Sequence, residues 1–214
     1  MTPTRSMVHV VDDDDSWRTS VQRLMSAAGY DVALYESAER FLAAANLDAP
    51  GCVLLDVRMP GLTGLELQQR ATESRRKLSI VFVSGQGDIP TSVSAMKAGA
   101  EDFLTKPVDT DVLLRAVERA IARDREERSR REQVETWRSR INALTPTERK
   151  VLDLVVLGKL NKQIALELGT AERTVKWHRH NLMQKLELQS IAELVVMAER
   201  LGLIGGERPH SEAG

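Results

Sequence analysis

The first 120 residues alternate between short apolar runs and amphipathic stretches, and this alternation restricts the fold more than any other feature of the chain. Five runs have the length and composition of buried strands: Val8–Val11, Tyr30–Tyr35, Cys52–Leu55, Leu78–Val83 and Phe103–Thr105. Each is followed by a stretch with helical periodicity: Ser16–Ala28, Ser37–Ala45, Leu62–Ala71, Ile89–Ala98 and Asp109–Ala122. Strands that alternate with helices form parallel sheets covered on both faces, and such strands are almost purely apolar. The pattern predicts an α/β fold with a doubly wound, five-stranded parallel sheet.

The next segment is rich in charges of both signs. Residues 122–132 contain neither Gly nor Pro, which predicts a solvated linker helix that continues the preceding one. Val134, Trp137 and Ile141 follow at helical spacing on one side of it. This stripe fits either a connector docked on a domain or a surface for a partner helix or a second copy, because three apolar positions are too few to identify a coiled coil.

A second module begins at Leu144. Thr145, followed by Pro146 and then by Glu148, is a helix start signal. Four short helices are predicted: Thr147–Leu157, Asn161–Leu168, Glu172–Leu186 and Ser190–Leu201. They predict a compact all-α domain, so we expect domains at residues 6–122 and 143–204, joined by a linker helix at 123–142.

The charge of the chain is distributed unevenly although its net charge is only −1. Residues 1–120 carry 13 Lys and Arg against 17 Asp and Glu, whereas residues 159–185 carry 6 against 2. An acidic N-terminal part and a basic segment in the C-terminal part are typical of two domains with different partners. The sequence has no secretory signal, no apolar stretch of the ~18 residues that a membrane helix needs, and a lone cysteine, Cys52, that cannot form an intramolecular disulfide. We therefore expect a cytoplasmic protein with no membrane partner.

Polar residues follow four of the predicted strands. Asp12–Asp15 follow the first, Asp56 the third, Ser84 the fourth and Lys106 the fifth. The carboxyl ends of parallel strands meet at one edge of the sheet, where open α/β folds bind ligands. Carboxylates suit Mg²⁺ and can act as nucleophiles that form an acyl phosphate, while a lysine and a hydroxyl can bind phosphoryl oxygens. The arrangement predicts one metal-and-phosphoryl site.

The second and third helices of the C-terminal module have helix-turn-helix spacing, with Gly169 in the turn. On the third helix one side is apolar: Val175, Leu182 and Leu186. The other side is cationic and aromatic: Arg173, Lys176, Trp177, His180 and Gln184. A helix of this kind can enter the major groove of DNA, although its composition alone also fits an ordinary solvated cationic helix.

The first module resembles the receiver domain of two-component response regulators. The resemblance rests on Asp12-Asp13 after a strand, Asp56 within Leu55–Gly61, Ser84, and Lys106-Pro107. It implies that a sensor histidine kinase phosphorylates Asp56, that Asp12 and Asp13 with Asp56 form a Mg²⁺ pocket, and that Lys106 contacts the phosphoryl group. It also implies a cis Lys106–Pro107 bond and a switch made by Ser84 and Phe103, although Phe103 fits a plain core position too. Asp14 and Asp15 extend the acidic run beyond the family pair, so we expect them at a helix start, where the helix dipole favours acids.

Haloacid-dehalogenase phosphatases also use an aspartate at a strand end. They need a second aspartate two residues later, where this chain has Arg58. Since the general acid is absent, we reject that enzyme class and expect no enzymatic function.

The second module resembles the LuxR-type helix-turn-helix, and the two modules together resemble the NarL/FixJ family, especially its FixJ-like branch. The matching segments are Leu144–Glu148, Asn161–Ala165 and Thr174–Leu186. The resemblance implies that Lys176, Trp177 and His180 read the groove, with Arg173 on the same face. It implies phosphate contacts or supports at four further positions: Lys162, Thr174, Arg179 and Lys185. The last helix resembles the family's dimerisation helix.

The second module also departs from the family pattern at three positions. Thr147 stands where Arg is common, Ala171 stands where Ser or Thr often caps the recognition helix, and Trp177 replaces a small β-branched residue. None of these changes breaks the predicted fold, but Trp177 predicts a different base preference.

These observations predict a phosphorylation-activated transcriptional regulator. Its expected partners are a sensor histidine kinase, promoter DNA, a second copy on phosphorylation, and RNA polymerase. Two alternatives stay open at this point: a DNA-binding regulator whose receiver works without phosphorylation, and a relay or interaction protein that does not act on DNA.

Overall fold

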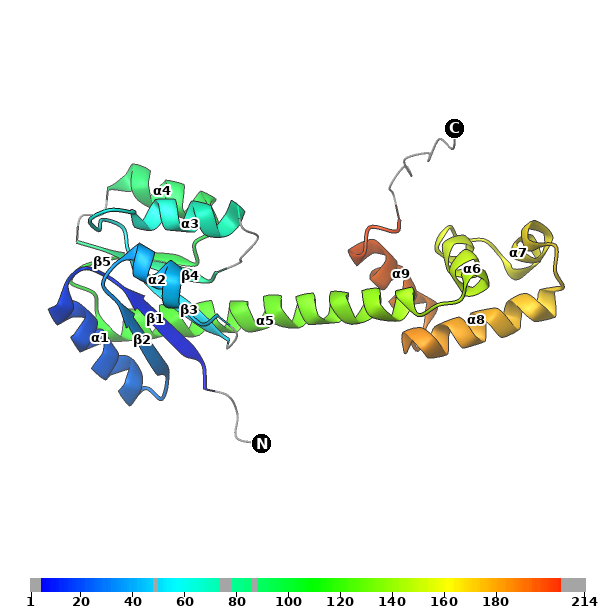
Figure 1. The fold of residues 1–214 in the computed structure, drawn as a ribbon, viewed down its shortest axis with the longest axis horizontal. Coiled ribbons are helices and arrows are strands. Elements are labelled where there is room, and N and C mark those ends of the chain that lie inside the picture. Colours follow the sequence, from blue (N-terminus) through cyan, green and yellow to red (C-terminus); the bar gives the residue numbers. More distant parts are fainter. Residues whose placement is uncertain (1–4, 48–49, 74–77, 86–87, 205–214) are drawn as a thin grey trace. The chain divides into compact units, whose positions relative to one another are not determined.

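The computed structural model describes residues 5–47, 50–73, 78–85 and 88–204. By its internal contacts the chain divides into two compact units, Met1–Arg128 and Ser129–Gly214. Helix α5, Thr110–Asn142, crosses the boundary between them (Figure 1). Among the described residues, no helix combines the length and the apolar composition needed to cross a bilayer.

The first unit contains the five-stranded sheet that the sequence predicts. Its strands are β1 (Met7–Val11), β2 (Asp31–Tyr35), β3 (Gly51–Asp56), β4 (Ile80–Ser84) and β5 (Asp102–Thr105). They pair in the order β2-β1-β3-β4-β5, and every pair is parallel. The strand order reverses between β1 and β3, so the carboxyl ends of these two strands flank the crevice where such folds bind ligands.

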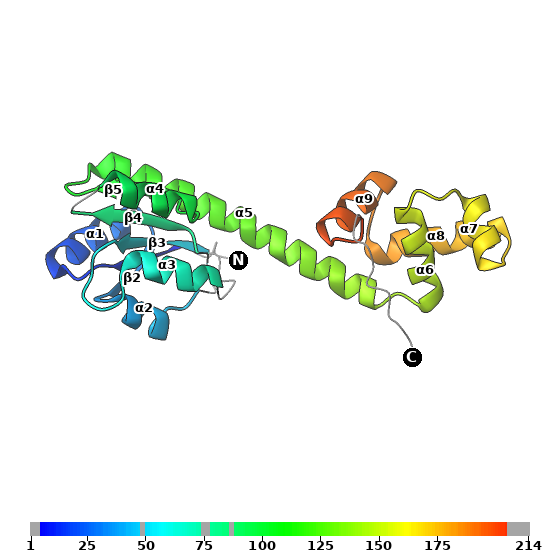
Figure 2. The same cartoon turned by 90° about the horizontal axis from the view of Figure 1, so that it is seen from above.

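Helices cover both faces of this sheet (Figures 1 and 2). The helices before α5 are α1 (Asp15–Ala27), α2 (Ala38–Ala44), α3 (Gly64–Glu73) and α4 (Ile89–Lys97). Apolar residues of α1 and α5 form one core cluster with the sheet, around Met25, Leu54 and Val117. Residues of α2, α3 and α4 form another on the opposite face, around Phe41, Leu67 and Phe82. Both faces of the three central strands, β1, β3 and β4, are therefore buried, as their apolar sequences predict, whereas the edge strands β2 and β5 are partly exposed.

The start of α3 differs from the prediction for a physical reason. Helix α3 begins at Gly64 rather than at Leu62, because the Thr63 hydroxyl accepts a hydrogen bond from the Glu66 amide at 3.3 Å while the Glu66 carboxylate accepts one from the Thr63 amide at 2.9 Å. This reciprocal cap fixes the start of the helix two residues late. The charged segment continues the helix before it without a break and forms α5, as the sequence predicts.

The second unit is all helical. Helices α6 (Pro146–Val156), α7 (Asn161–Leu168), α8 (Glu172–Leu186) and α9 (Ile191–Arg200) surround one apolar core. Trp137 and Ile141 of α5 belong to that core and are only 7% and 6% exposed, with Val134 packed against it. The apolar stripe of the linker is thus docked on its own domain, which favours the first of the two interpretations that the sequence allows.

Candidate functional site

The acidic run after β1 divides its four carboxylates among different tasks. Asp12 is fully buried and its Oδ1 accepts a hydrogen bond from the Asp14 amide at 2.9 Å, whereas Asp13 is exposed. Asp14 caps α1, accepting from the amides of Ser16 and Trp17 at 2.9 and 3.1 Å. Asp15 lies in the first turn and pairs with Arg18. The prediction that Asp14 and Asp15 start a helix is therefore confirmed, and Asp12 alone of the four is directed into the fold.

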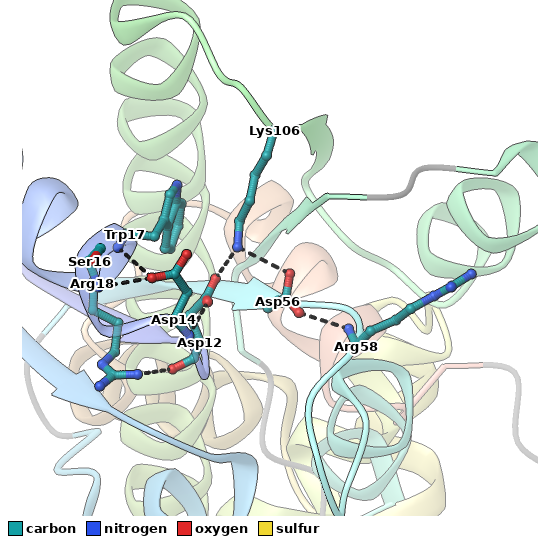
Figure 3. A network of polar contacts seen from close by, with 8 residues as sticks. All are labelled: Asp12, Asp14, Ser16, Trp17, Arg18, Asp56, Arg58 and Lys106. Carbon is teal, nitrogen blue, oxygen red and sulfur yellow. Dashed lines mark hydrogen bonds and ion pairs between the residues drawn. The ribbon is translucent and has the colours of Figure 1, made fainter.

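Asp12, Asp56 and Lys106 converge at the carboxyl edge of the sheet (Figure 3). The Lys106 ammonium lies 2.6 Å from Asp12 Oδ2 and 3.5 Å from Asp56 Oδ1. Lys106 reaches this position because it follows β5 directly, and its peptide bond to Pro107 is cis, as the resemblance implies. Residues separated by up to 94 positions in the sequence thus form one charged cluster.

The Asp56 carboxylate is only 6% exposed, and one of its oxygens accepts the Arg58 amide at 2.9 Å. Burial raises the pKa of Asp56 above its usual value; Lys106 opposes the shift and the neighbouring Asp12 charge adds to it. The net upward direction means that one lysine does not fully compensate two neighbouring carboxylates in this buried place. An additional cation would be favourable there.

The loop after Asp56 is held by a residue that the sequence did not single out. Glu39 of α2 accepts a hydrogen bond from the Leu62 amide at 2.8 Å, and its pKa is lowered chiefly by hydrogen bonds from backbone amides. Gly64, at the start of α3, passes so close to the Asp56 carbonyl oxygen that a β-carbon would lie 2.2 Å from it. Sequence reasoning had no signal for Glu39, because an exposed helical glutamate is common and its partner is a backbone group.

Ser84 lies on β4, which neighbours β3, and Phe103 lies on β5, at the edge of the sheet beyond β4. Ser84 ends β4, is 1% exposed, and its carbonyl oxygen accepts the Lys106 amide at 2.8 Å. Phe103 is half-buried on β5, with its ring centroid 6.1 Å from that of Phe82. Strand register pairs Ser84 with Thr105, so Ser84 stands beside the residue that precedes Lys106.

Two residues of α1 contribute to the charged cluster but were missed from the sequence. The ring of Trp17 lies under the Lys106 ammonium, 4.4 Å from Nζ to the ring centroid, and the Arg18 guanidinium donates to the Asp12 carbonyl oxygen. An aromatic residue and a cation in the first helical turn after the acidic run are the signals that could have indicated them.

Helix α8 of the second unit has the two faces that the sequence predicts. Val175, Leu182 and Leu186 of α8 are fully buried. The exposed residues of α8 include Arg173, Lys176, Trp177 and His180, and Trp177 keeps 60% of its surface exposed. Lys162 is exposed on α7, whereas Thr174 is half-buried. A cationic face with one exposed aromatic side chain is therefore available to a partner.

Two of the predicted DNA-contacting cations are engaged within their own unit. Arg179 donates to Asn161 Oδ1 at 2.8 Å, which ties α8 to α7. Lys185 donates to Glu148 Oε2 at 2.8 Å, and Glu148 is only 4% exposed. Burial alone would raise the pKa of Glu148, but hydrogen bonds from Lys185 and Thr145 outweigh it and leave the pKa lowered. These two cations hold the helix-turn-helix together.

Helix α8 begins without a side-chain cap, and it contains a buried histidine nitrogen without a hydrogen-bond partner among the described residues. Ala171 occupies the N-cap position and its side chain makes no capping hydrogen bond, in contrast to Thr145, which forms a capping box with Glu148. Within the described part of the chain, the buried Nδ1 atom of His178 has no hydrogen-bond partner, and the His178 ring lies 4.9 Å from the Trp177 ring.

Comparisons with known proteins agree with both units. A family model described as the response regulator receiver domain matches residues 8–118, and one described as bacterial regulatory proteins of the luxR family matches residues 142–198. Nodulation protein W of Bradyrhizobium diazoefficiens is 42% identical over 94% of this chain and 88% of that protein. The transcriptional regulatory protein FixJ of the same bacterium is 40% identical over 94% of this chain and 98% of that protein. Among solved structures, the response regulator StyR has a TM-score of 0.79 at 44% identity, covering 92% of this chain and 100% of that one.

Proposed function

Because this chain belongs to the NarL/FixJ family of two-component response regulators, we propose that Asp56 is its phosphoacceptor and that α8 is its DNA-reading helix. A receiver joined to a LuxR-type DNA-binding domain makes the chain a transcriptional regulator rather than an enzyme, and its family implies a sensor kinase and DNA as partners. We propose which residues carry these two activities, which metal binds, and which oligomeric state forms.

The observation that carries the proposal is the position of the Lys106 ammonium between Asp12 and Asp56. In phosphoryl transfer, an Asp56 oxygen forms a bond to phosphorus while the bond between phosphorus and the kinase histidine nitrogen breaks, and that nitrogen keeps the electron pair. Lys106 can neutralise charge on the transferred group, since catalysis of this reaction is mainly positioning and electrostatic stabilisation. Ser84, at the end of the neighbouring strand, is placed to offer a hydroxyl to a phosphoryl oxygen.

The donor set at this edge fits Mg²⁺. Asp12 and Asp56 both contact the same ammonium, so their oxygens point to a common place, and burial with incomplete compensation raises the pKa of Asp56. Mg²⁺ in phosphoryl-transfer sites needs only one or two carboxylates, and waters and phosphate oxygens complete its shell. Among the described residues no ready-made cluster of three such ligands occurs, and the exposed Asp13 completes our proposed set after a small movement. When bound, Mg²⁺ would neutralise the phosphoryl oxygens.

We assign Ser84 and Phe103 to the switch. A phosphoryl group adds about −1.5 to −2 charges at neutral pH, which biases a local element with two arrangements. Phe103 is only half-buried beside Phe82, so part of its surface can still become buried when Ser84 turns toward the new group.

On the DNA side, Lys176, Trp177 and His180, with Arg173, form the reading face, and Lys162 and Thr174 contact phosphates. Arg179 and Lys185 act as supports, because their partners Asn161 and Glu148 lie in the same unit. We further propose a homodimer on phosphorylation, contact with RNA polymerase at promoters, and a cytoplasmic location, where promoter DNA lies. The domain boundaries 6–122, 123–142 and 143–204 remain part of the proposal.

The first test is phosphorylation by a small acyl phosphate with Mg²⁺, followed by intact mass and oligomeric state. We expect one phosphoryl addition on the wild type and none on Asp56→Asn, whose side chain is nearly isosteric. A labelled Asp56→Asn protein would show that the acceptor is a different residue. No label on the wild type would favour the regulator that works without phosphorylation.

The second test concerns DNA. A sequence selected from random duplexes should bind the phosphorylated protein with an affinity that falls steeply as salt rises, since each neutralised phosphate releases counterions. Lys176→Ala with His180→Ala should remove most of this binding, whereas Lys150→Ala, an exposed lysine on α6, should leave it within about twofold. Regulation that persists without the two α8 residues would support a relay protein that does not act on DNA.

A further inference from the structure

Lys106 has a third partner besides its two carboxylates. Its ammonium lies over the Trp17 ring, 4.4 Å from the centroid (Figure 3). The indole packs against the core cluster that α1 and α5 form with the sheet, and this packing limits its freedom to turn away. A cation at this distance from an indole face is attracted by the ring quadrupole.

The three partners of Lys106 differ in what happens to them during the proposed reaction. Asp12 is a proposed Mg²⁺ ligand, so the metal competes with Lys106 for its oxygens. Asp56 becomes an acyl phosphate. Its oxygen that lies 3.5 Å from Lys106 is then either the bridging oxygen to phosphorus or the carbonyl oxygen, and in both cases it has lost its carboxylate charge. The Trp17 ring is the one contact of the three for which neither the metal nor the phosphoryl group competes.

We propose that Trp17 is a positioning residue for phosphoryl transfer: its indole keeps the Lys106 ammonium at the mouth of the site while Asp12 and Asp56 change partners. This inference rests on Asp56 being the phosphoacceptor. The indole touches neither donor nor metal, so it acts only through Lys106. Its loss therefore lowers the rate of transfer and leaves the binding of Mg²⁺ and of the donor unchanged.

The test compares three side chains at position 17 in the full-length protein. Initial rates of phosphorylation by acetyl phosphate are measured over a range of donor and Mg²⁺ concentrations. We expect the maximal rate to fall about fivefold in Trp17→Leu, which keeps an apolar side chain but has no ring, and about twofold in Trp17→Phe, whose ring quadrupole is weaker. The donor and Mg²⁺ concentrations for half-maximal rate should not change.

A structural control separates positioning from packing. Leu24→Ala removes another partly buried side chain of the same core cluster on α1, and it should leave the rate within about twofold. Wild-type rates in Trp17→Leu, equal losses in the Leu and Phe variants, or an equal loss in Leu24→Ala would each overturn the assignment. Asp56→Asn is run beside them: if it were labelled, the proposed acceptor would be wrong, and that result is distinct from any of these.

Fluorescence provides a readout that packing alone would not give. The emission of Trp17 should change on phosphorylation, because a new negative charge arrives beside the cation that stays over its ring. The difference between wild type and Trp17→Phe isolates this signal from the other two tryptophans, and it should vanish in Lys106→Met. A phosphorylation-dependent change of the same size in Lys106→Met would contradict the contact.

Discussion

The two units of this protein hold their functional charges in opposite ways. In the first, Asp12 and Asp56 are buried and meet Lys106, so the charges of the site contact each other. In the second, Lys176 and His180 are exposed on α8, where Lys176 pairs with Glu172, itself exposed, at 3.6 Å. The buried carboxylate of the second unit, Glu148, pairs with Lys185, which is itself exposed and is not one of these two residues.

This difference reflects what each site receives. Charges in a buried cluster interact strongly because water screens them poorly, so a new phosphoryl charge there forces the existing pairs to rearrange. Exposed cations are already solvated, and a polyanion such as DNA attracts them without rearrangement of the protein interior. The first arrangement suits a switch and the second suits a contact surface that is ready before its partner arrives.

Replacing one lysine in each site should give the largest effects, and their sizes test this comparison. Lys106→Met should slow phosphorylation by acetyl phosphate about 100-fold, because a single electrostatic partner of the transferred group is lost. Lys176→Met should weaken DNA binding about tenfold or less and reduce the salt dependence by about one phosphate. The measurements are initial phosphorylation rates by intact mass and DNA affinity by fluorescence anisotropy at several salt concentrations.

Each variant is also the control for the other. Lys106→Met should bind DNA in its unphosphorylated form as the wild type does, and Lys176→Met should be phosphorylated at the wild-type rate. If both lysines gave effects of similar size on their own activities, the contrast between an internal cluster and an open surface would be wrong.

Acid should destabilise the first unit before the second. His9 on β1 is 3% exposed, its Nδ1 atom lies 3.2 Å from the Tyr35 hydroxyl, and burial lowers its pKa to about 4. Between about 6.5, the ordinary histidine value, and 4, the unfolded state binds more protons than the folded state, so stability falls as pH falls. The first unit should therefore lose about 2 kcal/mol between pH 7 and pH 5. The raised pKa of Asp56 acts in the opposite direction wherever this group titrates, because the folded state then binds more protons than the unfolded state.

The stability of the second unit depends on pH in a different range, because of Glu148. Because its pKa is lowered, its contribution to stability is present above its usual value of 4.5 and is lost only as pH falls below that value. Calorimetry at pH 7 and pH 5 measures both units, and His9→Gln and Glu148→Gln identify which transition belongs to which. His9→Gln should flatten the pH response of the first transition; an unchanged response would remove His9 as its cause.

The sequence predicted most of the receiver site because that site follows from strand ends. Asp12, Asp56, Ser84 and Lys106 each come directly after or at the end of an apolar run, and parallel pairing then brings the runs together. The contribution of Trp17 and Glu39 was not predictable in this way. The contact of Trp17 depends on the path of α1, and its partner is the flexible side chain of Lys106. The contact of Glu39 depends on the path of the β3–α3 loop, and its partner is the backbone amide of Leu62.

On the helix-turn-helix the periodicity of α8 correctly separated buried from exposed residues, but it did not separate readers from supports. Arg179 and Lys185 have the same chemistry as Lys176 in the sequence, and only the positions of Asn161 and Glu148 show that they bind within their own unit. Charge alone therefore predicts a basic helix, whereas three-dimensional contacts determine which cations remain available.

The smallest expected effect is at the start of α8, which lacks the side-chain cap that helices in both units have. In the first unit α1, α2 and α4 have side-chain caps from Asp14, Ser37 and Asp88, but α8 begins at Ala171 without one. Ala171 has φ −80° and ψ 147°, which is the backbone conformation of a capped start, so a serine there can accept from the amides of the first turn without rearrangement. Ala171→Ser should stabilise the second unit by about 1 kcal/mol and leave the first unit unchanged.

Calorimetry detects this as a rise of the second transition alone, and the matched variant is Ser190→Ala. Ser190 caps α9 by accepting from the Glu193 amide at 3.2 Å, so its removal should lower the same transition by a similar amount. Because residue 171 lies outside the proposed reading face, Ala171→Ser should keep the selected DNA sequence of the wild type. An increase in stability accompanied by altered base preference would mean that the uncapped start of α8 takes part in recognition, and the separation between reading face and scaffold would have to be redrawn.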